Sequence, residues 1–126
     1  MAEEGIKILL AEDDRFLLEM YSSKFAQEKF RVVTAEDGES ALKAAREQTP
    51  DIILLDVLMP KMDGFEVLKR LKADETTKGI PVIFLTNLKE LDDVKAGMTM
   101  GAADYLIKPH TLPAEVVEKI KKILDK

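Results

Sequence analysis

Short apolar runs alternate with longer amphipathic segments along the chain. Five runs have the length and β-branched content expected of strands: 6–11, 31–35, 52–55, 80–85 and 105–107. Two of these, 52–55 and 80–85, contain no alternating polar residues, which is typical of strands covered on both faces. Between the runs, apolar residues recur at helical spacing, as at Leu17, Tyr21 and Phe25.

The predicted helices have recognisable ends. Asp37 or Glu39 is expected to open the second helix, and Thr49-Pro50 to close it, because the residue before proline leaves the α region. Gly101 is expected to stop the fourth helix. Thr111 is expected to cap the fifth, with a proline in its first turn.

Five strand units alternating with five helical units predict an α/β fold with helices on both faces of a parallel sheet. Right-handed crossovers leave few topologies for five strands. We expect the (βα)5 doubly wound, flavodoxin-like order 2-1-3-4-5. The chain shows no repeat and no linker, so residues 1–126 are predicted to form a single domain with a core over about 5–125.

Polar residues follow the first, third, fourth and fifth predicted strands. These residues are Glu12, Asp13 and Asp14 after the first strand, Asp56 after the third, Thr86 after the fourth and Lys108 after the fifth. In a parallel sheet of order 2-1-3-4-5 these strand ends share one edge, and the winding direction reverses between strands one and three. The pattern therefore predicts a ligand site where carboxylates, a hydroxyl and an amine converge.

The charges of this predicted cluster indicate a cation site. Carboxylates about 4 Å apart repel by roughly 1–4 kcal/mol at effective dielectric constants of 80 to 20. Oxygen ligands without histidine or cysteine suit Mg²⁺ or Mn²⁺. Since Mg²⁺ completes its coordination with waters and phosphate oxygens, the pattern favours phosphoryl chemistry with a carboxylate as nucleophile.

The composition narrows the alternatives. The chain has 126 residues and a net charge of -5, which argues against direct nucleic-acid binding. It has no cysteine and a single histidine, His110, which excludes disulfides, thiolate chemistry and multi-histidine metal sites. No apolar run approaches a membrane span, and the acidic start is unlike a signal peptide. A cytoplasmic location without membrane contact is therefore expected.

Four motifs, in their order along the chain, resemble the receiver domain of bacterial two-component response regulators, the chemotaxis-Y-like family. They are Leu-Leu-Ala-Glu-Asp-Asp (9–14), Asp-Ile-Ile-Leu-Leu-Asp-Val-Leu-Met-Pro-Lys-Met-Asp-Gly (51–64), Ile-Pro-Val-Ile-Phe-Leu-Thr (80–86) and Gly-Ala-Ala-Asp-Tyr-Leu-Ile-Lys-Pro (101–109). The resemblance covers about residues 5–125. Each motif alone is weak, but their order and spacing together are specific.

The resemblance implies a role for each site residue. Asp56 would be the phosphoacceptor. Asp13 and Glu12, the latter through water, would hold Mg²⁺ or Mn²⁺ together with Asp56 and the backbone carbonyl of Leu58. Thr86 would bond a phosphoryl oxygen and Lys108 would pair with it. Tyr105 would be the aromatic switch residue, and the Lys108-Pro109 bond would be cis.

The function implied by the resemblance is a phosphorylation-dependent signalling switch. A sensor histidine kinase or a phosphotransfer protein would be the donor. The chain would catalyse its own phosphorylation and dephosphorylation and would not be a turnover enzyme. Phosphorylation would change the surface of the fourth helix, fifth strand and fifth helix, which would bind a downstream protein, unless the chain is an excised receiver.

Two other functions are weighed against this one. The same fold could serve as a phosphorylation-independent pseudo-receiver, although none of the residues needed for chemistry is missing. A haloacid-dehalogenase-like hydrolase would need a second aspartate where Leu58 stands, and a cap domain that the chain has no room for. A dinucleotide-binding fold is excluded because no Gly-x-Gly-x-x-Gly follows the first strand.

Some positions allow a plainer structural interpretation or depart from the family pattern. Asp14 could be a third ligand, but an N-cap of the first helix is favoured. Asp63-Gly64 is interpreted as a turn and cap, and Tyr105 could be only a half-buried aromatic residue. The departures from the family pattern are Asn87 after Thr86, the apolar Leu58, and His110 after Lys-Pro. The first is expected to alter the phosphoryl lifetime, and the second leaves the hydrolysis rate open.

Overall fold

The structure is a computed structural model that describes residues 5–87, 90–107 and 113–125. Strands and helices alternate along these residues. The elements are β1 (Lys7–Ala11), α1 (Arg15–Gln27), β2 (Arg31–Ala35), α2 (Gly38–Gln48), β3 (Ile52–Asp56), α3 (Gly64–Lys72), β4 (Val82–Thr86), α4 (Leu91–Gly97), the 3₁₀-helix η3 (Met98–Met100), β5 (Asp104–Ile107) and α5 (Pro113–Leu124).

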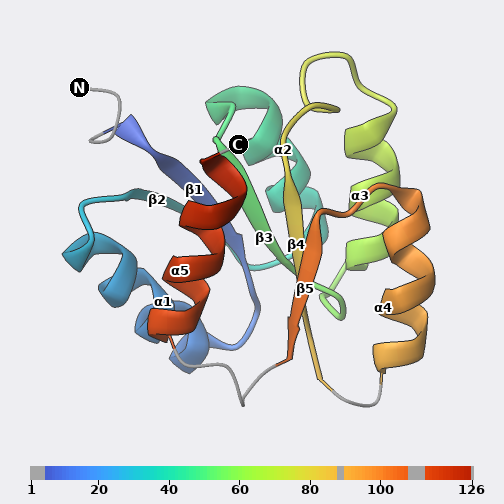
Figure 1. The fold of residues 1–126 in the computed structure, drawn as a ribbon. Coiled ribbons are helices and arrows are strands. Elements are labelled where there is room, and N and C mark those ends of the chain that lie inside the picture. The colour runs from blue at the N-terminus through green and yellow to red at the C-terminus, as the bar shows by residue number, and fades with distance from the viewer. Residues whose placement is uncertain (1–4, 88–89, 108–112, 126) are drawn as a thin grey trace.

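The strands form one parallel sheet in the order β2-β1-β3-β4-β5, which confirms the predicted topology. The order reverses direction between β1 and β3, where Ala11 pairs with Leu55. All five strands run the same way, so their carboxyl ends meet at one edge, the lower edge in Figure 1. The register therefore brings together the residues that follow Ala11 and Leu55, which are Glu12 and Asp56.

Two apolar layers cover the sheet. One face packs against α1 and α5, and the other against α2, α3 and α4 (Figure 1). Every residue of β3 and β4 is buried, so the continuous apolar runs are explained by cover on both faces. In α1 the buried residues are Leu18, Tyr21 and Phe25, whereas Leu17 is only partly buried. The apolar face predicted for this helix is therefore confirmed, with Leu18 more buried than Leu17.

Aspartates cap three of the helices. The side chains of Asp14, Asp37 and Asp63 accept hydrogen bonds from the backbone N–H three residues on, which confirms the cap predicted at each end. The hydrogen bond donated by the Ser40 backbone N–H lowers the pKa of Asp37, against a smaller opposing effect of burial. These caps fix where each helix leaves the carboxyl edge of the sheet.

The fourth helical segment ends at the predicted glycine, but its last turn is a 3₁₀ turn. The α-helix stops at Gly97 and continues as the 3₁₀ turn η3, before Gly101 adopts φ 110°. Gly101 therefore ends the helical segment as expected, because a left-handed conformation is favourable for glycine. The expected cap Thr111 lies outside the described residues. No helix in the described part of the chain is both long and apolar enough to cross a membrane.

Truncation of Phe84 tests the packing of the core. Its ring is fully buried in β4 and lies 5.2 Å from the ring of Phe65 between centroids. We predict that Phe84→Ala lowers the free energy of unfolding by about 3–5 kcal/mol in urea titrations, because it leaves a cavity. Phe16→Ala is the control, since Phe16 is 73% exposed and its truncation should cost at most about 0.5 kcal/mol. Equal costs for the two variants would contradict the described packing.

Candidate functional site

Two neighbouring strands place the acidic residues. Ala11 ends β1 beside Leu55 of β3, so Glu12 and Asp56 are the next residues in register. Side chains alternate between the two faces of a strand. Leu10 and Leu54 belong to the layer under α1 and α5, and Glu12 and Asp56 are two residues further along on that same side.

Glu12, Asp13 and Asp56 form a compact carboxylate cluster. One oxygen from each of them lies within 4.8 Å of the others. Glu12 and Asp56 are buried, with 0% and 4% of their surface exposed, whereas Asp13 is exposed. The convergence predicted from the residues that follow the strands is therefore present for these three acids.

Backbone N–H groups orient two of these carboxylates. The Asp14 N–H donates to Glu12 Oε2 at 3.0 Å, and the Leu58 N–H makes a long bond of 3.4 Å to Asp56 Oδ1. The N–H of Val57 donates to the Leu85 carbonyl at 3.1 Å, which ties the chain beyond Asp56 to β4. Asp14 itself caps α1 through Leu17 and is not one of the clustered acids.

Gly64 has a role that the sequence pattern did not reveal. A Cβ at this position would lie 2.6 Å from the carbonyl oxygen of Asp56 and 3.0 Å from Val57 Cα. Only a residue without a side chain lets the start of α3 approach the backbone of Asp56 so closely. The Asp63-Gly64 pair indicated a turn, but the close approach depends on the path of α3, which local sequence does not contain.

Thr86 ends β4 beside this cluster. Its side chain is buried, and its hydroxyl donates to the Asn87 carbonyl at 3.0 Å. Thr86 pairs with Ile107, the residue before Lys108. Lys108 and Pro109 lie outside the described residues, so the structure neither adds the predicted amine to the cluster nor tests the predicted cis bond; His110 lies outside them as well.

Tyr105 lies in β5 next to Phe84. It is half-buried and packs against the apolar layer that includes Phe84 and Val94. Thr86 is two residues beyond Phe84 and therefore points to the same side of the sheet. Both interpretations of Tyr105, switch residue and half-buried strand aromatic, are compatible with this position.

The donor set of the cluster fits a hard divalent cation. Three carboxylates within 4.8 Å supply only oxygen ligands, which Mg²⁺ and Mn²⁺ prefer over softer donors. Mutual repulsion of charges at this spacing amounts to about 1–4 kcal/mol per pair at effective dielectric constants of 80 to 20. A bound cation relieves that repulsion, so the chemistry of these side chains matches the predicted metal site.

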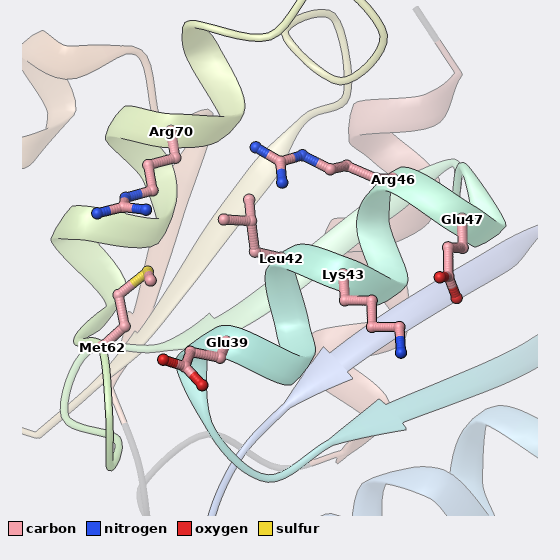
Figure 2. Close-up of a pocket in the computed structure, with 7 residues that line it drawn as sticks. All are labelled: Glu39, Leu42, Lys43, Arg46, Glu47, Met62 and Arg70. Carbon is pink, nitrogen blue, oxygen red and sulfur yellow. The ribbon is translucent and has the colours of Figure 1, made fainter.

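A separate hollow of about 520 Å³ lies between α2 and α3 (Figure 2), and none of the three clustered acids is among its lining residues. Its charged side chains include Lys43, Arg46 and Arg70 as well as two glutamates. The Nε of Arg46 already binds Asp74 at 3.0 Å, and that of Arg70 binds Glu66 at 2.8 Å. These opposite charges nearly balance, so the hollow has no evident selectivity for a ligand.

Comparison with known proteins identifies the family. The family model for the response regulator receiver domain matches residues 8–121. Among curated relatives, response regulator PleD of Caulobacter vibrioides is 45% identical over 103 residues, covering 82% of this chain and 23% of that protein. The alkaline phosphatase synthesis transcriptional regulatory protein PhoP of Bacillus subtilis is 39% identical over 118 residues, covering 94% of this chain and 48% of that protein. The chain thus spans about half the length, or less, of these relatives.

Solved structures agree with this result. The receiver domain of sensor histidine kinase PA1611 from Pseudomonas aeruginosa, with a magnesium ion coordinated in its active site cleft, superposes with a TM-score of 0.88 at 29% identity. That match covers 97% of this chain and 99% of the PA1611 chain. Chemotaxis protein CheY4 of Vibrio cholerae matches with a TM-score of 0.86 at 29% identity, covering 94% and 98% of the two chains. The chain therefore belongs to the response regulator receiver domain family, as the family match, the strand order and the carboxylates at the point where that order reverses all indicate.

Proposed function

We propose that this receiver domain accepts a phosphoryl group on Asp56 from a sensor histidine kinase or a phosphotransfer protein. The observation that carries the proposal is the cluster of Glu12, Asp13 and Asp56 within 4.8 Å at the point where the sheet reverses direction. An acidic cluster at this point of the sheet combines a nucleophilic carboxylate with ligands for a cation. A domain of this kind is a signalling switch and not a turnover enzyme.

The proposed transfer is a substitution at phosphorus. A carboxylate oxygen of Asp56 forms the new O–P bond while the N–P bond of the donor phosphohistidine breaks, and the released imidazole takes a proton from water. Glu12, through water, and Asp13, with the carbonyl of Leu58 and Asp56 itself, would hold Mg²⁺. Bound Mg²⁺ supplies positive charge that offsets the charge on the phosphoryl oxygens.

Thr86 and Lys108 complete the proposed site. The Thr86 hydroxyl donates to the Asn87 carbonyl in the described state. It would exchange this partner for a phosphoryl oxygen, which is a stronger, charged acceptor. Lys108 would pair with the phosphoryl group. A cytoplasmic location and a downstream protein partner belong to this proposal too.

Tyr105 would report the state of Thr86. The two residues lie on the same side of the sheet, on adjacent strands, next to α4. Movement of Thr86 toward a phosphoryl group would open space into which the half-buried Tyr105 ring turns. The change would reach the surface of α4, β5 and α5, where the downstream partner would bind.

The first experiment tests the phosphoacceptor. Incubation with acetyl phosphate and Mg²⁺ should add the mass of one phosphoryl group to the intact protein. Asp56→Asn should remove this gain because it removes the nucleophile. Asp92→Asn, an exposed aspartate of α4, is the matched control and should keep it. An unmodified wild-type protein, or an equal gain in Asp56→Asn, would refute the proposal.

A second experiment separates this function from a pseudo-receiver. Calorimetry should detect Mg²⁺ binding to the wild-type protein and at least tenfold weaker binding to Asp13→Asn. One lost charge about 4 Å from the ion is worth roughly 1–4 kcal/mol at effective dielectric constants of 80 to 20. Asp51→Asn, at an exposed aspartate outside the cluster, should bind as the wild type does. Undetectable Mg²⁺ binding to the wild-type protein would instead favour a phosphorylation-independent binding module.

A third experiment follows the switch. Phosphorylation should shift the NMR resonances of the Tyr105 ring in the wild-type protein and in Thr86→Ser, which keeps the hydroxyl. Thr86→Ala should still gain phosphoryl mass but show little ring shift, since the hydroxyl that follows the phosphoryl group is gone. A full ring shift in Thr86→Ala would show that Tyr105 does not respond through Thr86.

A further inference from the structure

A groove of about 430 Å³ is lined by residues around the start of α3 and by residues of α4 and its flanks. Its apolar lining includes Leu58, Phe65 and Met100. Leu58 follows Asp56 by two residues, so one end of the groove adjoins the carboxylate cluster. This surface shares α4 with the surface considered above, but none of its described lining residues belongs to β5 or α5.

Exposed apolar side chains are concentrated at this groove. The described residues contain three large hydrophobic side chains that are exposed, and two of them, Leu58 at 54% and Met100 at 40%, line it. Single exposed apolar side chains are ordinary, whereas neighbouring ones at a hollow are typical of interaction sites. The groove therefore offers apolar surface that a partner can remove from water.

Two small residues contribute to the α4 side of the groove, and one of them packs closely against Phe65. Ala96 and Gly97 line it from α4. A Cβ at Gly97 would lie 3.1 Å from the Phe65 ring and 3.3 Å from the Phe84 ring. The Phe65 ring is held against buried Phe84 with an interplanar angle of 60°. A bulky side chain at position 96, which is exposed and lines the groove, would fill space that is now available to a ligand.

The polar lining carries one sign of charge. Asp63, Glu90 and Asp93 contribute three carboxylates, and no lysine or arginine is among the described lining residues. None of the three forms an ion pair with another residue in 5–87, 90–107 or 113–125. Asp63 accepts a hydrogen bond from the Glu66 N–H at 2.9 Å, which leaves its negative charge in place.

From this combination we infer that the groove docks a basic, amphipathic segment of a partner protein. A bulky apolar side chain would enter between Leu58, Phe65 and Met100, and flanking lysine or arginine residues would meet the three carboxylates. The carboxylates would repel nucleic acid and acidic peptides. Docking does not require the phosphoryl group, and only its link to signalling rests on the proposed function.

A displayed library of random 15-residue peptides tests the inference, with unphosphorylated protein in Mg²⁺ as the target. Enriched peptides should combine a large apolar residue with two or more lysines or arginines. Their affinity should fall about tenfold or more for Ala96→Trp, which fills the groove, and for Asp93→Lys, which reverses its charge. Asp92→Lys, with the same change on the adjacent exposed residue, and Ala26→Trp, on the exposed end of α1, should bind within about twofold of the wild type.

Several outcomes would overturn the inference. The first is that no peptides are enriched, and the second is that the enriched peptides are acidic. The third is that Ala96→Trp and Asp93→Lys bind the peptides as tightly as the wild type does. The fourth is that binding is lost in Asp13→Asn instead, which would locate the peptides at the carboxylate cluster. Urea midpoints measured on every variant check that the fold is intact, and phosphoryl mass gain measured on the groove variants and their controls checks that the carboxylate cluster is intact. Failure of the mass gain in the wild-type protein would refute the proposed function and leave the docking result standing.

Discussion

Repulsion among three carboxylates is the constraint on which the site depends. The parallel register of β1 and β3 brings Glu12 and Asp56 side by side, and Asp13 joins them, all within 4.8 Å. Two of the three are buried, where water screens their charges less than at the surface. Such a cluster is favourable only with positive charge nearby. Under the proposed function, a divalent cation would supply that charge and would allow an anionic phosphoryl group to approach Asp56.

The fold supplies this constraint through its buried strands. β3 and β4 are buried along their whole length, so the apolar layers on both faces hold the strand ends in place. Gly64 lets α3 start against the backbone of Asp56. The Val57 N–H donates a hydrogen bond to the carbonyl of Leu85, near the end of β4. Asp56, the proposed nucleophile, is thus held by close packing of the backbone on one side and by backbone hydrogen bonds on the other. Preorganisation of this kind reduces the reorganisation needed when charge develops during transfer.

Much of this arrangement could be predicted from the sequence because it depends on local periodicity and on strand ends. The five strands, their order, the caps at Asp14 and Asp63 and the convergence of Glu12, Asp13 and Asp56 follow from those patterns. The early end of α4, the need for glycine at position 64 and the groove beside Phe65 depend on distances between helices that are remote in sequence. Lys108 was predicted for the site, but its place lies outside the described residues, and its role stays a prediction.

Paramagnetic broadening by Mn²⁺ tests the central claim most directly. At substoichiometric Mn²⁺, the account predicts selective loss of the amide resonances of Asp13, Asp56 and Leu58, and recovery of those signals when excess Mg²⁺ competes. Resonances around the α2–α3 hollow, such as Arg46, should persist. Broadening centred on the acids Asp63, Glu90 and Asp93, or spread evenly over exposed carboxylates, would contradict a built cation site at the carboxyl ends of β1 and β3.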